Sequence, residues 1–152
     1  MSIFRDETIY KLRANGYSTD YLFDFSIASD WKNSSWRTIY IDQPELGVSR
    51  EYLIKGLEEK DVRHYYDYMQ KVAVMFGADP VRAAHELKES LEFEVKLAKA
   101  SLPREERRNA TALYHPMSLD ELSIAVPIIN WTSCINNILT PELLQVYSTR
   151  HS

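Results

Sequence analysis

Cysteine, glycine and long apolar runs are all scarce in this sequence. The one cysteine, Cys134, excludes an internal disulfide and a cysteine-rich zinc site. With only four glycines, the chain has no glycine-rich phosphate loop and no Gly-x-Ser-x-Gly motif. The apolar run Ile124–Ile129 has six residues, one of them proline, whereas a membrane span needs about 20. Because Met1–Asp6 is charged early and lacks an apolar core, we expect neither a signal peptide nor an anchor in this chain.

A strong excess of charge of one sign is also missing. The 152 residues carry 18 basic and 22 acidic side chains, which gives a net charge of −4. A nucleic-acid-binding stripe needs concentrated positive charge, and the stretch Arg104–Arg108 mixes arginine with glutamate. We therefore expect no nucleic-acid partner. With 45% hydrophobic residues, the composition is that of a folded, mildly acidic globular domain.

The hydrophobic pattern predicts a mostly α fold with one antiparallel β-hairpin, a multi-helical α+β chain. Alternating apolar residues predict two strands, Tyr21–Ala28 and Trp36–Asp42, joined by a polar loop. Apolar residues at three- and four-residue spacing predict the helices. These helices are expected at 7–15, 49–56, 58–76, 80–101, 119–125 and 131–139. The short connection between the two longest helices predicts an antiparallel pair.

Capping residues mark several of the predicted helix boundaries. Gly77 ends one helix, and Asp79–Pro80 begins the next as N-cap and first helical residue. Ser118 and Glu121 have the spacing of a capping box. Asn130 is expected to cap the last predicted helix.

The ionisable residues offer only weak candidates for a catalytic or metal site. The sequence at His85 begins like the zinc-protease motif His-Glu-x-x-His, but Glu89 replaces the second histidine and no third ligand is evident. A solvent-facing helix surface is favoured there. The acidic pairs at 58–59, 105–106 and 120–121 lie in polar stretches, where nothing buries a carboxylate to raise its pKa. We assign no catalytic and no metal-ligating residue, and we interpret Cys134 as a buried structural residue.

Three Asn-x-Ser/Thr sequons begin at Asn33, Asn109 and Asn130. Asn33 and Asn109 fall in predicted polar loops, where a glycan would be tolerated, whereas Asn130 is favoured as a helix cap. All three are candidate sites of N-linked glycosylation. Glycosylation at any of them would imply a secreted or luminal protein.

Longer motifs extend over most of the chain in a fixed order. They are Asp30–Ser35, Ile41–Gly47, Ser49–Tyr52, Glu92–Ala98, Arg107–Thr111, Leu113–Leu122, and Pro127 with Trp131. In this order and spacing they resemble the neprilysin and endothelin-converting-enzyme family of zinc metallopeptidases, over about Leu12–Leu139. The similarity is to the non-catalytic N-terminal part of such an enzyme.

The resemblance implies a zinc metalloendopeptidase that cleaves small regulatory peptides, with zinc-activated water as the attacking group. It implies that this helical region forms a lid and wall of the substrate chamber, and that the zinc ligands and catalytic residues come from the remaining catalytic lobe. Peptide substrates and that lobe are the implied partners, and the parent protein is implied to be an extracellular or plasma-membrane ectodomain. Zinc is expected in the parent and not in this chain, which alone is expected to be inactive. The match at Asn109 also implies a glycan site.

The resemblance weakens toward the C-terminus of the chain. We expect residues 1–139 to be part of the peptidase N-terminal domain, residues 140–152 to be a divergent tail, and the whole chain to be a fragment. Some family members have a cysteine pair between the positions of Tyr52 and Tyr66, and this chain has none. The alternative interpretation is a catalytically inactive module that binds a peptide or a partner chain.

Overall fold

The fold is described from a computed structural model of the chain, which covers residue 11 and residues 15–17 and 20–139. The chain divides into two compact units. One is Asp20–Asn109, and the other combines Met1–Thr19 with Ala110–Ser152. Each unit is described by itself. The predicted helix at 7–15 lies mostly outside the described residues, and the predicted tail at 140–152 lies wholly outside them.

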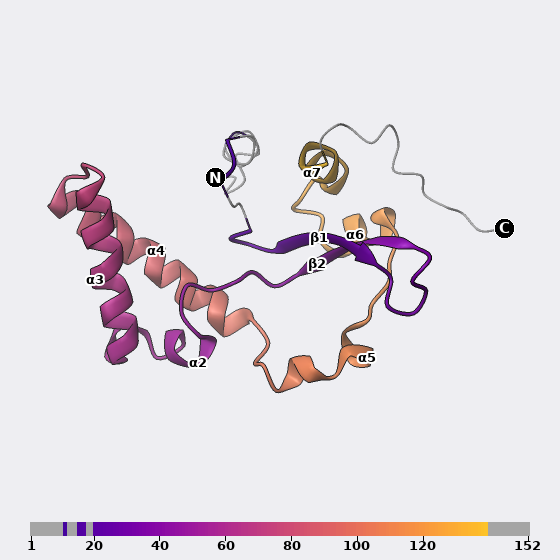
Figure 1. The fold of residues 1–152 in the computed structure, drawn as a ribbon, viewed down its shortest axis with the longest axis horizontal. Coiled ribbons are helices and arrows are strands. Elements are labelled where there is room, and N and C mark those ends of the chain that lie inside the picture. Colours follow the sequence, from indigo (N-terminus) through magenta and orange to yellow (C-terminus); the bar gives the residue numbers. More distant parts are fainter. Residues whose placement is uncertain (1–10, 12–14, 18–19, 140–152) are drawn as a thin grey trace. The chain divides into compact units, whose positions relative to one another are not determined.

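The Asp20–Asn109 unit begins with the predicted antiparallel hairpin, drawn in indigo and purple in Figure 1. Strand β1 is Asp24–Ser29 and strand β2 is Arg37–Asp42. The register places Phe25 opposite Ile41 and Ile27 opposite Ile39. The predicted first strand started too early, because residues 21 and 22 form a turn. Within β1, the residues from 26 onward are exposed.

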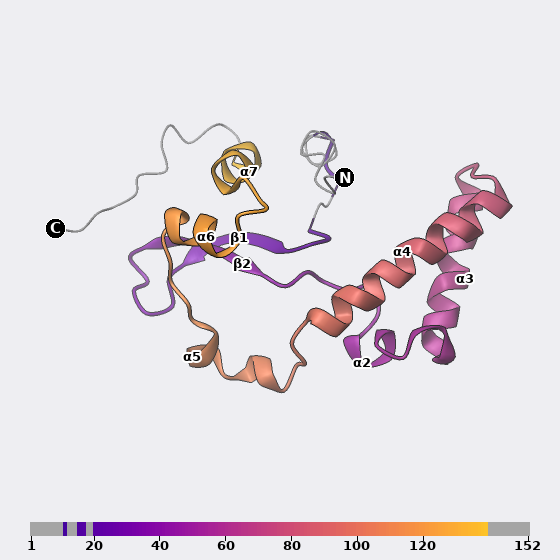
Figure 2. The same cartoon turned by 180° about the vertical axis from the view of Figure 1, so that it is seen from behind.

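Helices make up the rest of this unit, as Figure 2 also shows from behind. They are α2 (Arg50–Leu53), the 3₁₀ turn η1 (Gly56–Glu58), α3 (Lys60–Met75), α4 (Pro80–Ala100) and the 3₁₀ turn η2 (Glu106–Arg108). Asp79 caps α4 by accepting a hydrogen bond from the Arg82 N–H at 2.8 Å, as the Asp79–Pro80 signal predicted. Ser49 stands at the N-cap of α2 but makes no capping bond through its side chain.

The core of this unit lies where α2, α3 and α4 meet. Its fully or nearly fully buried members are Leu53, Val62, Leu91 and Ala98. A polar contact also holds α3 against α4. The Tyr66 hydroxyl on α3 donates to the Ala84 carbonyl on α4 at 2.6 Å. Tyr65 and Tyr66, both on α3, pack against this core.

The turn between α3 and α4 exposes large apolar side chains. Gly77 ends α3 with φ of +93°, a left-handed conformation that glycine adopts at no steric cost. Met75, Phe76 and Val81 are each 80% exposed or more. Val81 lies in the first turn of α4, and Ala83 in the same turn is buried.

The second unit has three helices among its described residues. They are α5 (Ala110–Leu113), α6 (Leu119–Ala125) and α7 (Trp131–Ile138). Helix α6 begins with the predicted capping box, and α7 begins at the predicted cap Asn130. Trp131 is 4% exposed, and its indole N–H donates to the Val126 carbonyl at 3.0 Å. The fold is thus mostly helical with one two-stranded hairpin, as predicted. Within the described ranges, no helix is long and apolar enough to cross a membrane.

We predict that Leu91→Ala destabilises the chain by about 2–5 kcal/mol, because it removes a nearly fully buried side chain between α3 and α4 and leaves a cavity. The measurement is denaturant unfolding followed by circular dichroism. Val81→Ala on the same helix is the matched control and should change stability by about 0.5 kcal/mol or less. Equal losses in both variants would contradict the assigned core.

Candidate functional site

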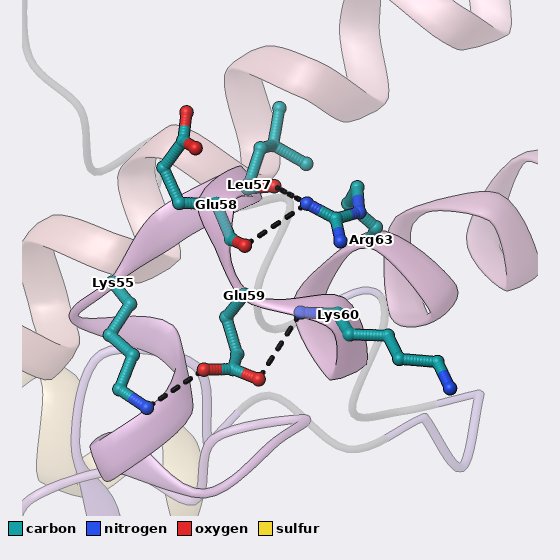
Figure 3. Close-up of polar contacts among 6 residues, drawn as sticks. All are labelled: Lys55, Leu57, Glu58, Glu59, Lys60 and Arg63. Carbon is teal, nitrogen blue, oxygen red and sulfur yellow. Dashed lines mark hydrogen bonds and ion pairs between the residues drawn. The ribbon is translucent and has the colours of Figure 1, made fainter.

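Glu59, in one of the candidate acidic pairs, joins η1 to α3 (Figure 3). Its carboxylate accepts a hydrogen bond from Lys55 Nζ at 2.7 Å and caps α3 by accepting from the Lys60 N–H at 3.2 Å. The bond from Lys55 holds the pKa of Glu59 below its ordinary value, and the same bond raises the pKa of Lys55. A carboxylic acid that acts as a general acid needs a raised pKa, whereas the pKa of Glu59 is lowered.

Arg63 of α3 also stabilises the connection between η1 and α3. Its guanidinium donates to the carbonyls of Leu57 and Glu58 at 3.0 Å each (Figure 3). These carbonyls end a 3₁₀ turn, where backbone acceptors lack helical partners. The Glu58–Glu59 region is therefore a structural junction between two helical segments.

A second acidic pair, Asp120 with Glu121, lies in the first turn of α6. The Glu121 carboxylate accepts hydrogen bonds from the Ser118 N–H at 2.6 Å and from the Ser118 hydroxyl at 2.9 Å. These bonds hold the pKa of Glu121 below its ordinary value, and the bond from the Ser118 N–H has the larger effect. Glu121 is thus used for capping and has no raised pKa.

The remaining candidates lie apart from one another. His85 and Glu89 are exposed on α4. In the part of the chain that the structure describes, no group of three or more His, Cys, Asp or Glu residues could hold a metal ion. Cys134, predicted to be buried, is partly buried on α7.

Among the described residues, a set of polar contacts ties the segment after β2 to the C-terminal end of α4. The Gln43 amide makes two bonds with the Leu102 backbone, accepting from its N–H at 2.9 Å and donating to its carbonyl at 3.3 Å. Arg50 Nε donates to the Ser101 carbonyl at 2.9 Å, and Ser101 is buried. These bonds satisfy backbone groups that the end of α4 would otherwise leave without partners.

Two further contacts extend this connection along the same segment. Asp42, at the end of β2, forms an ion pair with Arg107 in η2. The Gly47 N–H donates to Glu94 Oε1 at 2.6 Å. We call the whole set of contacts the β2–α4 clamp. It joins Asp42, Gln43, Gly47 and Arg50 to Glu94, Ser101, Leu102 and Arg107.

Tyr65 of α3 completes the clamp at Gly47. Burial raises the pKa of Tyr65 to about 12, and the charge of Glu94 and a hydrogen bond to it act in the same direction. A Cβ atom built on Gly47 would lie 2.2 Å from the Tyr65 hydroxyl oxygen, so a larger residue at this position would collide with the ring. Glycine is needed here for close approach and not for an unusual φ.

The sequence alone did not predict the clamp. Its partners are 47 to 65 residues apart, and no local periodicity connects them. A signal was present, because Ile41–Gly47, Ser49–Tyr52 and Glu92–Ala98 are among the motifs that carry the family resemblance. The structure brings these three motifs to one place.

The three sequons lie in different local settings, and all three asparagines are exposed. Asn33 is in the hairpin loop, where its Oδ1 accepts the Ser35 N–H at 3.2 Å. Asn109 is the C-cap residue of η2. Asn130 Oδ1 accepts the Ser133 N–H at 3.1 Å, which confirms its predicted role as the cap of α7. Glycosylation at these residues stays a prediction.

We predict that Tyr65→Phe weakens the loss of stability at alkaline pH. The folded chain holds the Tyr65 proton to a pKa of about 12, whereas the unfolded chain releases it near 10.0, so stability falls as pH rises between these values. The expected contribution is about 1 kcal/mol, because the phenol is partly exposed. Urea unfolding at pH 9 and about pH 11.5 tests this. The exposed Tyr68→Phe is the control, and identical pH dependence in both variants would contradict the prediction.

The chain matches the N-terminal domain of the family described as peptidase family M13 over residues 6–151. It is 46% identical over 140 residues to Neprilysin-2 of Drosophila melanogaster, covering 92% of this chain and 18% of that protein. It is 40% identical over 129 residues to the human Membrane metallo-endopeptidase-like 1, covering 78% of this chain and 17% of the relative. It is 34% identical over 128 residues to the guinea pig (Cavia porcellus) Endothelin-converting enzyme 1, covering 82% of this chain and 17% of that enzyme. The chain spans less than a fifth of the length of these relatives. The resemblance in the motifs is thus confirmed, and the chain belongs to peptidase family M13.

Proposed function

We propose that this chain is the non-catalytic N-terminal part of a neprilysin-like zinc metalloendopeptidase that cleaves small regulatory peptides. In this role it forms a lid and wall of the substrate chamber. The observation that carries the proposal is the β2–α4 clamp, because Gln43 and Arg50, which lie in motifs that mark the family, use their side chains there to hold the backbone at the end of α4. Such contacts build a rigid surface and carry no chemistry of their own.

The chemistry is assigned to parts of the family's longer chains. The described residues do not fit a zinc centre, since they bring together no three potential ligands. Glu59 and Glu121, at the starts of α3 and α6, have lowered pKa values and form capping hydrogen bonds. In this proposal, zinc and the catalytic groups therefore lie in the remaining lobe, which is the partner of this chain.

Exposed apolar side chains support a role as one wall of a larger structure. Met75, Phe76 and Val81 of one unit, and Ile124 and Ile128 of the other, are each 80% exposed or more. Water-exposed apolar groups of this size are often covered by a partner surface. We propose that the remaining lobe covers part of them.

An extracellular or plasma-membrane ectodomain is the proposed location of the parent protein. The three exposed sequons agree with a luminal route, because N-linked glycans are added in the secretory pathway. The proposed protein is therefore a glycoprotein.

We predict that the purified chain hydrolyses no fluorogenic peptide and retains no stoichiometric zinc, because its described residues offer no metal site. The measurements are a peptidase assay and elemental analysis after gel filtration. An activity that is lost on chelation, restored by zinc and co-purifies with the chain would overturn the assignment. Peptide binding without hydrolysis would instead favour the inactive binding module.

We predict that this chain can replace the matching segment of Neprilysin-2 from Drosophila, with which it shares 46% identity over 140 residues. The hybrid should cleave short peptides and leave folded proteins intact, because the wall of the chamber is preserved. A hybrid carrying Arg50→Ala should lose activity at a lower temperature than one carrying the exposed control Glu89→Ala. A folded, zinc-loaded hybrid without peptidase activity would contradict the wall role.

A further inference from the structure

One pair of adjacent basic residues occurs in the sequence, Arg107–Arg108. The two arginines end η2, and Asn109 follows them as its C-cap residue. The boundary between the two compact units falls at the same place, because one unit ends at Asn109 and the other resumes at Ala110. The basic pair therefore lies in the segment that connects the units along the chain, between the labels α4 and α5 in Figure 1.

The segment around the basic pair is open to solvent. Every residue from 104 to 113 is exposed, and neither η2 nor α5 contains a buried residue. A protease binds several consecutive residues of its substrate in an extended conformation, which burial and long regular elements prevent. Exposed segments between compact units are therefore preferred sites of proteolytic cleavage.

The backbone hydrogen bonds around the pair are long. The Arg107 N–H donates to the Pro103 carbonyl at 3.3 Å, and the Arg108 N–H donates to the Glu105 carbonyl at 3.4 Å. N–H···O bonds in proteins mostly measure about 2.7–3.2 Å, and longer ones are weaker. Opening of η2 to an extended form thus breaks only weak bonds and exposes no core residue.

Asp42 restrains one of the two arginines. Its carboxylate at the end of β2 forms the ion pair with Arg107 that belongs to the β2–α4 clamp. The two side chains are 38% and 52% exposed for Arg107 and Asp42, so water competes with this ion pair and holds its contribution small. Every residue of the clamp precedes Asn109. A cut after Arg108 would therefore leave all the contacts of the clamp in place.

We propose that Arg107–Arg108 is a processing site, where an endoprotease specific for paired basic residues cuts the chain after Arg108. Acidic pockets of such an enzyme bind the two guanidinium groups, and Asp42 slows the cut by holding Arg107. The inference rests on the proposed extracellular role, because proteases of this class act in the secretory pathway. Processing would keep the Asp20–Asn109 unit folded and remove its covalent link to the segment that carries α6 and α7.

The reaction is hydrolysis of one peptide bond. The bond between the Arg108 carbonyl carbon and the Asn109 nitrogen breaks, and one water molecule is consumed. The water oxygen joins the carbonyl carbon to form a carboxylate, and the amide nitrogen takes up a proton to leave as an amino group. Both new charges lie in an exposed segment, so neither has to be desolvated.

The site is tested on the full chain made in bacteria, where Asn109 carries no glycan beside the bond. We expect a purified endoprotease specific for paired basic residues to give two fragments, one ending at Arg108 and one starting at Asn109, identified by mass spectrometry. Arg108→Gln should abolish this cut. An uncut, folded wild-type chain would overturn the proposal.

A matched control separates exposure from the ability of the backbone to open. In the Arg108→Gln background, Glu89→Arg places a second basic residue beside Lys88, and both positions are exposed on α4. The cut there should be about tenfold or more slower than the wild-type cut, because α4 must first unfold locally. Each rate is divided by the rate on a synthetic peptide of the same sequence. Equal normalised rates would overturn the proposal.

We predict that Asp42→Asn speeds the wild-type cut by about two- to fivefold, because it releases Arg107 from a weak ion pair. Glu86→Gln is the control, since it removes the ion pair of Glu86 with Arg82 on α4 and should leave the rate unchanged. An unchanged or slower cut in Asp42→Asn would contradict the restraint by Asp42.

Processing in cells is tested by expressing the Asn109→Gln chain behind a cleavable secretory leader in insect cells, so that no glycan can block the bond. We expect a secreted fragment that starts at position 109 and disappears when paired-basic endoproteases are inhibited. An intact secreted chain without the inhibitor would overturn the proposal. Because the cut is detected by fragment mass, this inference can fail while the peptidase hybrid remains active, and the reverse also holds.

Discussion

The end of helix α4 imposes the constraint on which the Asp20–Asn109 unit depends. A helix that stops leaves carbonyl groups without partners inside the helix, and burial of Ser101 at this end keeps water from replacing them freely. Arg50 supplies a donor to the Ser101 carbonyl, and Gln43 bonds the backbone of Leu102 in both directions. Fixing these groups also fixes the path of the chain that leaves β2.

The same path brings Gly47 against α3 and α4. Its N–H bonds Glu94, and Tyr65 occupies the space that a side chain at position 47 would need. This crowding joins three segments at one point, so the orientation of α3 relative to α4 depends on a loop residue as well as on the apolar core. The core residues Val62 and Leu91 lie on these two helices, and Leu53 on α2 packs against them. Polar contacts and apolar packing therefore act together in this unit.

Local signals in the sequence predicted local structure well. The capping box at Ser118, the cap at Asn130 and the Asp79–Pro80 start all lie within a few residues of the groups they bond, so spacing alone predicted them. The alternation that begins at Tyr21 was misleading, because the first part of that stretch turns before the strand starts. The clamp escaped prediction because it joins Asp42 to Arg107 and Gly47 to Glu94 over long separations that sequence periodicity does not encode. The family motifs marked its residues without showing which of them touch.

The hydrogen bonds at the end of α4 constrain the amino-acid identity of their two partners unequally. Gln43 and Arg50 contribute side-chain atoms, whereas Ser101 and Leu102 contribute backbone atoms that every residue except proline can supply in full. At Leu102, substitutions should therefore be tolerated wherever backbone geometry is kept. The buried Ser101, whose hydroxyl also donates to the Leu97 carbonyl, should allow fewer replacements, and Gln43 and Arg50 should allow few. The side-chain half of these bonds is therefore the stricter one, and it lies in the loop after β2 and in the first turn of α2.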